Sequence, residues 1–420
     1  MEYSHRYHAY PTQEVAERLD SHIDVHRQAY NHTRYEYSHL REDTDTIGSA
    51  YNHHARLTDW KTEFPVFKEV HSKALQRTVT RFYQNLSNLS KQKANGRKVG
   101  RLKWKSPREF QSMTYSQSGF ELKNTSGRNA TLWLSKIGDI NIRYHREIPD
   151  EASIKEITIK KETTGDWFVS FGLETDDADP PEKPDVDSLD TSNSVGIDLG
   201  ILSYVHTSDA KTVDWLDLED EYDRLRREQR KLSRKKKGSN NWEKQRRNVA
   251  KVTRYIQRKV LDYQHKITTW LVREYDAVFV EDLDVKGMLE QSHNARNKQD
   301  AAWRQFITLL EYKSDLYGCH VVQVDPKGTT KECAACGVET AKPIWVREHS
   351  CPSCEFECAR DANAAMNVLQ RGFSELGLGW PEDTPVETAL PTDTTTVSAK
   401  RVVETGSPTL KERTASAVSE

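Results

Sequence analysis

The sequence is poor in the residues that build large apolar surfaces. Only 35% of its 420 residues are apolar, against about 45–50% in average globular chains, and 30% are charged. Its most apolar runs, such as 267–272 and 277–280, are far shorter than the roughly 18–20 residues of a membrane-spanning helix. The first residues include Glu2 and Arg6, where a secretion signal has an apolar stretch. We therefore expect a cytoplasmic protein without a membrane partner.

Cysteine is also scarce, and in a cytoplasmic chain six cysteines do not indicate disulfides. Four of them form two CxxC pairs separated by 14 residues: Cys333, Cys336, Cys351 and Cys354. Each pair places two sulfurs on one side of a metal ion, and a hairpin between the pairs completes a tetrahedron. We therefore predict a structural Zn²⁺ site with no position for a catalytic water, and redox chemistry is the alternative. Cys319 is expected in a buried strand, whereas Cys358 could compete as a ligand.

A net charge of −2 conceals a strongly uneven distribution of charge. Residues 222–260 hold 16 basic and 3 acidic residues, so this block carries +13 and the remaining chain −15. Residues 91–108 hold 8 basic residues and no acid. Such blocks are typical of proteins that bind nucleic acid, although a solvated helix face is the alternative. The predicted nucleic-acid contacts are Lys98, Arg101, Lys103, Trp104, Lys105, Arg227, Lys235, Lys236, Arg246 and Arg247.

The first half of the chain changes from helical to strand periodicity. Apolar residues spaced by three, four or seven predict a helix over 12–40 with Thr12 as its N-cap, and further helices within 48–90. Between 115 and 173, short alternating runs separated by glycine and asparagine predict a small β-barrel or sandwich. An acidic, proline-containing stretch over 174–190 is expected to be a linker.

The second half alternates strands and helices. Strands are predicted over 195–201, 203–206, 212–216, 277–281 and 319–324, and helices over 219–237, 241–275, 298–317 and 361–371. The two helices over 219–237 and 241–275 carry the second basic block. The zinc hairpin follows the last strand, and the tail beyond Trp380 has the composition of a disordered segment.

Asp198 lies in a strand between two glycines. Gly196, Asp198 and Gly200 share one face because side chains alternate along a strand. We expect the two missing side chains to leave room beside the carboxylate for a metal ion and a phosphate.

Two further acids are expected near Asp198. Glu281 ends an apolar strand, and Asp282 should point the other way. Asp361 opens a helix of small residues that can pack closely on a sheet. Three carboxylates from separate elements can hold two Mg²⁺ ions for phosphodiester hydrolysis, although each alone could be an ordinary strand end or helix cap.

These motifs together resemble a known family. VGIDLGILSYV from residue 195, VFVEDLDVKGM from 278, CAACG, CPSC, and RDANAAMNVL from 360 occur in the order typical of the OrfB/TnpB family. This family is encoded by insertion sequences and is related to the type V CRISPR effector nucleases. The resemblance extends to about residue 372 and includes AYPT and RQAYN near the N-terminus.

The resemblance implies a multidomain α+β chain with an RNase H-like (RuvC) α/β catalytic domain, an inserted zinc ribbon, and an N-terminal β-barrel with an inserted helical domain. The family's catalytic triad falls on Asp198, Glu281 and Asp361, as ligands of two Mg²⁺ ions, and its zinc ligands on the four cysteines. The implied domains are 1–114 (N-terminal segment and helical recognition domain), 115–174 (wedge barrel), 175–192 (acidic linker), 193–326 with 357–379 (nuclease), 327–356 (zinc ribbon) and 380–420 (disordered tail).

The implied function is that of a transposon-encoded, RNA-guided DNA endonuclease. Its partners would be a guide RNA from the end of its own element and double-stranded DNA with a short adjacent motif. The barrel and its helices would hold RNA and read that motif. We expect a monomer with RNA, at the nucleoid of a prokaryotic cytoplasm.

Two positions depart from the family pattern. Ala359 stands where the family usually has an aspartate two residues before the third catalytic acid, and Glu355 stands where a glycine with positive φ is expected after the second CxxC. These changes leave open a nuclease-dead regulator that binds DNA under RNA guidance. An accessory transposase in DNA recombination is a third hypothesis, but the sequence shows no candidate tyrosine or serine nucleophile motif.

Overall fold

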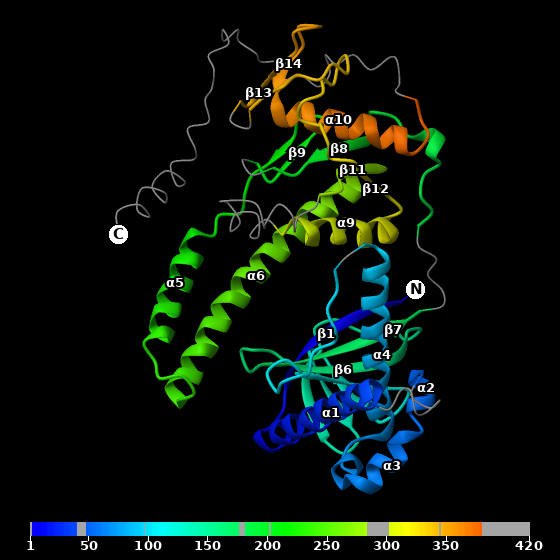
Figure 1. Ribbon diagram of the computed structural model, residues 1–420, viewed down its shortest axis with the longest axis vertical. Helices are drawn as coiled ribbons and strands as arrows, with labels where there is room; N and C mark the ends of the chain where they lie inside the picture. The colour runs from blue at the N-terminus through cyan, green and yellow to red at the C-terminus, as the bar shows by residue number, and fades with distance from the viewer. Residues whose placement is uncertain are drawn as a thin grey trace. The chain divides into compact units, whose positions relative to one another are not determined.

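The chain folds into two compact units. The computed structural model describes residues 2–39, 48–96, 98–175, 181–200, 203–283, 302–343 and 346–379. The N-terminal unit comprises Met1–Asp179 with Glu228–Lys251, and the C-terminal unit comprises Pro180–Arg227 with Val252–Glu420 (Figure 1). The predicted tail over 380–420 and the first residues of the helix predicted over 298–317 lie outside the described residues.

A seven-stranded antiparallel sheet forms the centre of the N-terminal unit, in the order β2-β6-β7-β1-β5-β4-β3. Its strands are β1 (Glu2–Tyr10), β2 (Ser112–Ser116), β3 (Phe120–Ser126), β4 (Asn129–Leu134), β5 (Gly138–Arg143), β6 (Ser153–Lys161) and β7 (Trp167–Glu174). The short alternating runs predicted between 115 and 173 as strands correspond to β3–β7. The sequence analysis missed β1, although it pairs with two neighbours, because its buried face carries His5, Tyr7 and only one aliphatic residue, Ala9.

Two helices, α1 (Gln13–His39) and α4 (Ser72–Ala94), pack against this sheet. On these helices lie α2 (Ala50–His53), α3 (Arg56–Glu63) and the 3₁₀ turn η2 (Pro65–Lys68). The predicted N-cap is confirmed, because the Thr12 hydroxyl accepts a hydrogen bond from the Val15 N–H at 3.4 Å. Residues of α1 and α4 join the sheet in one core, for example Leu19 and Phe82. A smaller core surrounds the fully buried Trp60.

The C-terminal unit contains a five-stranded sheet in the order β10-β9-β8-β11-β12. Its strands are β8 (Ser194–Asp198), β9 (Val205–Thr207), β10 (Thr212–Val213), β11 (Ala277–Glu281) and β12 (His320–Val324). The first three form an antiparallel meander, whereas β11 and β12 run parallel to β8. Each strand predicted in this region is present, and β8 and β10 are shorter than predicted.

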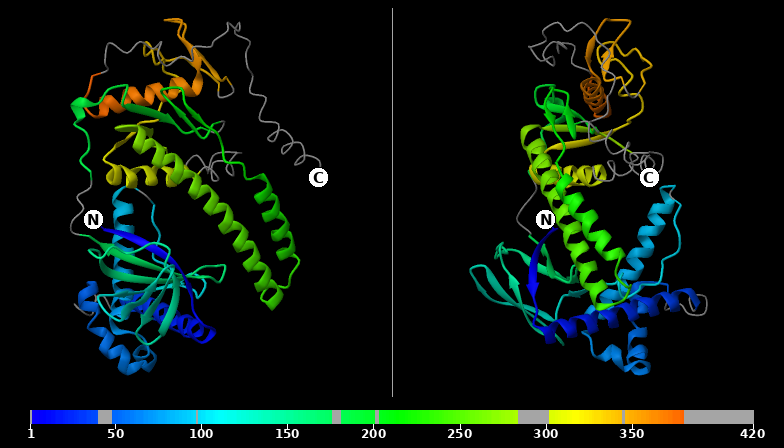
Figure 2. Two further views of the ribbon diagram at one scale, coloured as in Figure 1. Left: turned by 180° about the vertical axis from the view of Figure 1, so that it is seen from behind. Right: turned by 90° about the vertical axis from the view of Figure 1, so that its left-hand side faces the viewer.

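Helices cover both faces of this sheet. They are α6 (Asn240–Glu274) and α9 (Trp303–Tyr317) on one face and α10 (Arg360–Glu375) on the other (Figure 2), while α5 (Glu219–Ser233) packs on α6. Val278 and Val280 of β11 pack among residues of α6 and α9, and Phe279 packs on α10. A Cβ on Gly372 would lie 2.1 Å from the Phe279 ring, so only glycine allows α10 this close to the sheet.

A short 3₁₀ turn, η3 (Val186–Ser188), precedes β8, and a small hairpin of β13 (Glu348–Ser350) and β14 (Glu357–Ala359) leads into α10. Among the described residues, none of the helices has the length and apolar character needed to cross a bilayer.

Candidate nuclease and zinc site

The three carboxylates predicted as catalytic lie on one face of the C-terminal sheet. Asp198 ends β8, Glu281 ends β11, and Asp361 lies in the first turn of α10. In the parallel register Val280 pairs with Ile197, so the two acids that follow end neighbouring strands. Both point to the face that α10 covers, because strand side chains alternate. Asp282 follows the end of β11 and is exposed.

The glycine that precedes Asp198 in the pattern permits helix packing. A Cβ on Gly196 would lie 2.2 Å from the Ala365 carbonyl oxygen and 2.5 Å from the Leu369 backbone nitrogen. The expectation that Gly196 leaves room for a metal ion and a phosphate is therefore wrong, because the backbone of α10 fills that space. Gly200 does border the carboxylate, since a Cβ there would lie 3.8 Å from Asp198 Oδ2.

Two of the carboxylates each accept a short hydrogen bond. The Thr329 hydroxyl donates to Glu281 Oε1 at 2.6 Å, and Arg347 Nη2 donates to Asp361 Oδ2 at 2.6 Å. Both donors lie between β12 and β14. The sequence analysis predicted neither of them, because no local spacing relates Thr329 or Arg347 to the acids that they contact.

Asp198 lies in a strongly unfavourable place for a negative charge. Its exposed fraction is only 8%. Burial and the charges of Glu281 and Asp361 raise the pKa of Asp198 well above its ordinary value, against the opposing effect of two arginines. Burial also raises the pKa of Glu281, while the Thr329 hydrogen bond and Arg371 lower it. A cation bound by these oxygens would favour the ionised form of both acids.

The donor chemistry of this site fits magnesium, which prefers carboxylate oxygens. The oxygens do not form a closed cage. Among the described residues, the four ribbon cysteines are the only group of three or more His, Cys, Asp or Glu side chains whose ligand atoms all lie within 4.8 Å of one another.

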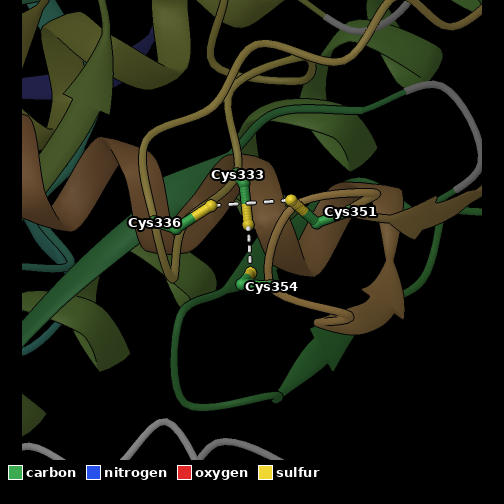
Figure 3. Close-up of side chains that lie close together, drawn as sticks. All are labelled: Cys333, Cys336, Cys351 and Cys354. Carbon is green, nitrogen blue, oxygen red and sulfur yellow. Dashed lines mark hydrogen bonds between the residues drawn. The ribbon is translucent and has the colours of Figure 1, made fainter.

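The four cysteines meet as predicted (Figure 3). The Sγ atoms of Cys333 and Cys354 are 3.7 Å apart, and those of Cys336 and Cys351 are 3.5 Å apart. Tetrahedral zinc with bonds of about 2.3 Å places its sulfurs about 3.8 Å apart, so the set fits zinc. Cys358 lies outside this group of four.

The remaining cysteine, Cys319, is buried as expected, but it precedes β12 instead of lying within it. Its pKa is raised to about 12, chiefly by burial.

The two turns of the zinc site confirm the expected need for positive φ. Gly337 follows the first CxxC with φ of +74°, and Glu355 follows the second with φ of +60°. Glycine adopts this conformation without steric cost, whereas a residue with a Cβ loses about 1 kcal/mol. Glu355 therefore strains the second turn without preventing the cysteines from meeting.

Two asparagines one helical turn apart fasten the zinc hairpin to α10. Asn363 and Asn367 are buried, and both donate to the Thr329 carbonyl, at 3.3 and 2.7 Å. Asn363 Oδ1 also accepts the Ala334 N–H at 3.0 Å. Arg360 donates to further carbonyl groups of the hairpin. The sequence analysis missed these residues, although two asparagines at helical spacing on an apolar face were a usable signal.

The first basic block is held on α1. The Asn31 side chain bonds the N–H and the C=O of Lys105, at 2.8 and 3.0 Å. Arg34 donates to the Leu102 carbonyl at 2.7 Å, and its guanidinium lies 4.1 Å from the centre of the Trp104 ring. Trp104 is 49% exposed and is therefore not a core residue. The exposed basic side chains of this segment include Lys98, Arg101 and Lys103.

The second basic block lies on α5, the turn after it and α6. Four of the predicted contacts are exposed: Arg227, Lys235, Lys236 and Arg247. Arg246 is partly buried and donates to Glu243 at 2.8 Å and to the Thr163 carbonyl at 3.4 Å. Four of these five basic side chains therefore face solvent, and the fifth, Arg246, makes its hydrogen bonds within the protein.

Comparison with known proteins gives two matches to family models. Residues 178–292 match OrfB_IS605, described as "Probable transposase", and residues 303–368 match the TNB domain of Cas12f1-like proteins. The chain is also similar to the cryo-EM structure of a Cas12f1–sgRNA–target DNA complex. The TM-score is 0.59 at 16% sequence identity, and the likeness covers 85% of this chain and 83% of the other. This likeness shows the fold, which is mixed α/β.

Two relatives match most of the chain. A protein of Streptomyces pristinaespiralis named "Putative RNA-guided DNA endonuclease" is 34% identical over 386 residues, covering 89% of this chain and 90% of the relative. An Escherichia coli K12 protein, which bears the same name with the suffix InsQ, is 27% identical over 343 residues and covers 77% and 80%. The 34% identity to the Streptomyces protein over nearly the whole of both chains shows that the protein belongs to the OrfB/TnpB family.

Proposed function

We propose that this protein is a transposon-encoded, RNA-guided DNA endonuclease. The observation that carries the proposal is the convergence of Asp198, Glu281 and Asp361 on one face of the sheet, where mutual repulsion favours a bound cation. The names of the relatives and the fold support it. The order of elements, from the antiparallel meander to α10, supports a RuvC-like domain, and the domain limits inferred from the sequence belong to the same proposal.

The carboxylates would hold two Mg²⁺ ions, which would activate water and stabilise the leaving oxygen. Thr329 fixes one oxygen of Glu281 and leaves the other for a ligand. Arg347 pairs with Asp361 through Nη2, and the other nitrogens of its guanidinium would contact a phosphate. Burial and both other acids oppose the charge of Asp198, which would be the ligand most dependent on the cations.

The cysteine site would hold a structural Zn²⁺, because four sulfurs leave no position for water. Its role would be to place Thr329 and Arg347 beside the carboxylates, since both lie in segments fastened to α10. The basic blocks on α1, α5 and α6 would contact a guide RNA from the element end and DNA beside a short motif. We propose that one chain acts with one RNA.

The decisive experiment is cleavage by the full chain co-expressed with the end of its element. The Asp198→Ala variant should lose about 10³-fold or more of the Mg²⁺-dependent cleavage of a target plasmid library, because a proposed metal ligand is gone. Binding of RNA and DNA should persist. Asp282→Ala is the matched control, since Asp282 is adjacent to Glu281 but exposed.

The outcomes separate the alternatives. Cleavage that survives in Asp198→Ala removes the catalytic role of this residue. Guided DNA binding without cleavage in the unaltered chain supports the regulator that Ala359 and Glu355 leave open. Transfer of DNA ends by the chain alone, with no other transposase present, supports the third hypothesis.

The proposed zinc site is tested by measuring the zinc bound to purified variants. Cys336→Ser should lower bound zinc from one equivalent to near zero, whereas Cys358→Ser should leave it unchanged, because Cys358 lies outside the group of four sulfurs. Equal zinc loss in both variants would contradict the assigned ligand set.

A further inference from the structure

A polar pocket of about 560 Å³ lies in the N-terminal unit, where α4 passes over strands β2 and β6. Its lining consists almost wholly of hydrogen-bonding side chains, among them Arg81, Gln84, Asn88, Ser112, Thr114 and Thr158. Pockets for apolar small molecules are lined mainly by hydrophobic and aromatic residues, so this lining favours a charged or polar ligand.

Arg81 is fixed in position at this pocket. Its Nη1 donates to the Ser112 hydroxyl at 3.1 Å and to the Ser112 carbonyl at 3.4 Å. Its guanidinium lies 4.9 Å from the centre of the Phe110 ring. The Phe110 ring and the two hydrogen bonds to Ser112 restrain the guanidinium on one side. A restrained arginine loses little entropy when it binds an anion.

The charge of Arg81 has no anionic partner among the described residues, where none of its nitrogens lies within 4.0 Å of a carboxylate oxygen. Its neighbour Arg77, one turn earlier on α4, does pair with Glu156 at 2.8 Å. Burial lowers the pKa of Arg81, and the charge of Arg77 lowers it further. A partly buried cation with this surrounding is stabilised by an anion that enters the pocket.

We propose that this pocket binds a backbone phosphate of a nucleic acid, with Arg81 contacting the phosphate and the amides and hydroxyls contacting the adjoining sugar. The inference rests on the proposed function, because a nucleic-acid partner supplies the phosphate. The distribution of charge along the sequence does not indicate this site, because Arg81 is the one charged residue within 78–84 of the amphipathic helix α4.

The test compares four full-length variants by fluorescence anisotropy, with guide RNA alone and with DNA duplex added to the RNA complex. Arg81→Gln removes the contact, and Gln84→Glu places a carboxylate three residues from Arg81 on the exposed side of α4. Gln84→Lys adds a cation at the same place. Arg143→Gln removes one exposed charge from β5, several strands away in the sheet.

We expect Arg81→Gln and Gln84→Glu to weaken binding about tenfold and Gln84→Lys to strengthen it about threefold, as for loss or gain of one phosphate contact. The slope of log affinity against log salt should fall by about 0.7 for Arg81→Gln if the phosphate belongs to single-stranded RNA and by about 0.9 if it belongs to duplex DNA. Which of the two binding reactions weakens identifies the source.

Unchanged affinity in Arg81→Gln and in both Gln84 variants overturns the inference, and so does an equal loss in Arg143→Gln. Because Gln84 is exposed, its variants keep the test valid if Arg81→Gln fails to fold. Failure of the unaltered chain to bind RNA or DNA would instead refute the proposed function.

Discussion

Two buried carboxylates, one in each unit, have opposite surroundings. Glu36 in α1 of the N-terminal unit is 3% exposed, and Asp198 in β8 of the C-terminal unit is 8% exposed. Burial opposes the charge of both. Four residues that donate to Glu36 outweigh burial and lower its pKa, whereas two acids near Asp198 add to burial and raise its pKa.

The donors of Glu36 form a closed set. His53 Nε2 and Trp60 Nε1 each donate at 2.9 Å, Arg56 Nη2 at 3.0 Å, and His32 lies at 3.5 Å. A fully compensated acid of this kind holds helices together and has no capacity left for a ligand. An acid that neighbouring acids repel has that capacity, and the comparison separates a structural carboxylate from a candidate metal ligand.

The largest expected effect is on the compensated acid. Glu36→Gln should destabilise the N-terminal unit by about 3–5 kcal/mol, because it leaves buried donors without their charge partner. Hydrogen exchange followed over α1 and α4 measures this. Glu156→Gln is the matched control: its pair with Arg77 is partly exposed and should contribute less than about 1 kcal/mol. Equal destabilisation by Glu36→Gln and Glu156→Gln would show that the donors around Glu36 add no more stability than a partly exposed ion pair.

The second prediction concerns Asp198, the acid that neighbouring carboxylates repel. Without divalent ions, Asp198→Asn should stabilise the C-terminal unit by on the order of 1 kcal/mol, because one repulsive charge is removed. With Mg²⁺ at 100 times its Kd, the unaltered chain should gain about 2.7 kcal/mol and the variant much less. Thermal unfolding with and without Mg²⁺ measures both. A variant that gains as much as the unaltered chain would show that Asp198 is not a ligand.

The third effect is a pH dependence of the N-terminal unit. The pKa of Glu36 is lowered in the folded state, so the unfolded state binds the proton first. The stability from Glu36 is therefore complete above its unfolded pKa of about 4.3 and is lost as pH falls below that value, by up to about 1.4 kcal/mol per pH unit. Urea unfolding from pH 6 to pH 3.5 should show this extra slope in the unaltered chain and not in Glu36→Gln.

The smallest expected effect concerns a carboxylate introduced at position 359, which could be stabilised like Glu36 or repelled like Asp198. Ala359 is the N-cap of α10 and provides no side-chain hydrogen bond. Ala359→Asp should stabilise α10 by about 1 kcal/mol, because its carboxylate can accept free N–H groups of the first turn. Urea unfolding measures the change. Destabilisation would mean that repulsion from Asp361 and Asp198 outweighs the cap, and the new acid would then resemble Asp198 instead of Glu36.

Local patterns were enough to predict much of this protein. The CxxC spacing predicted the cysteine group, the alternation of Gly196, Asp198 and Gly200 singled out the acid in β8, and the apolar run that ends in Glu281 predicted β11. Other features depend on contacts between distant segments. Thr329 and Arg347 lie 48 and 14 residues from their acids, and Glu36 in α1 receives three of its four donors from α2 and α3.

The sequence by itself therefore determined the family, most of the elements and the residue types able to bind zinc and magnesium, because spacing along a strand, helix or turn has a fixed geometry. Only the tertiary structure decided which charges are compensated. It showed that α10 fills the space beside Gly196, that Glu36 is enclosed by donors, and that Arg81 has no carboxylate partner among the described residues. Compensation depends on distances between segments far apart in the chain, and no local periodicity encodes those distances.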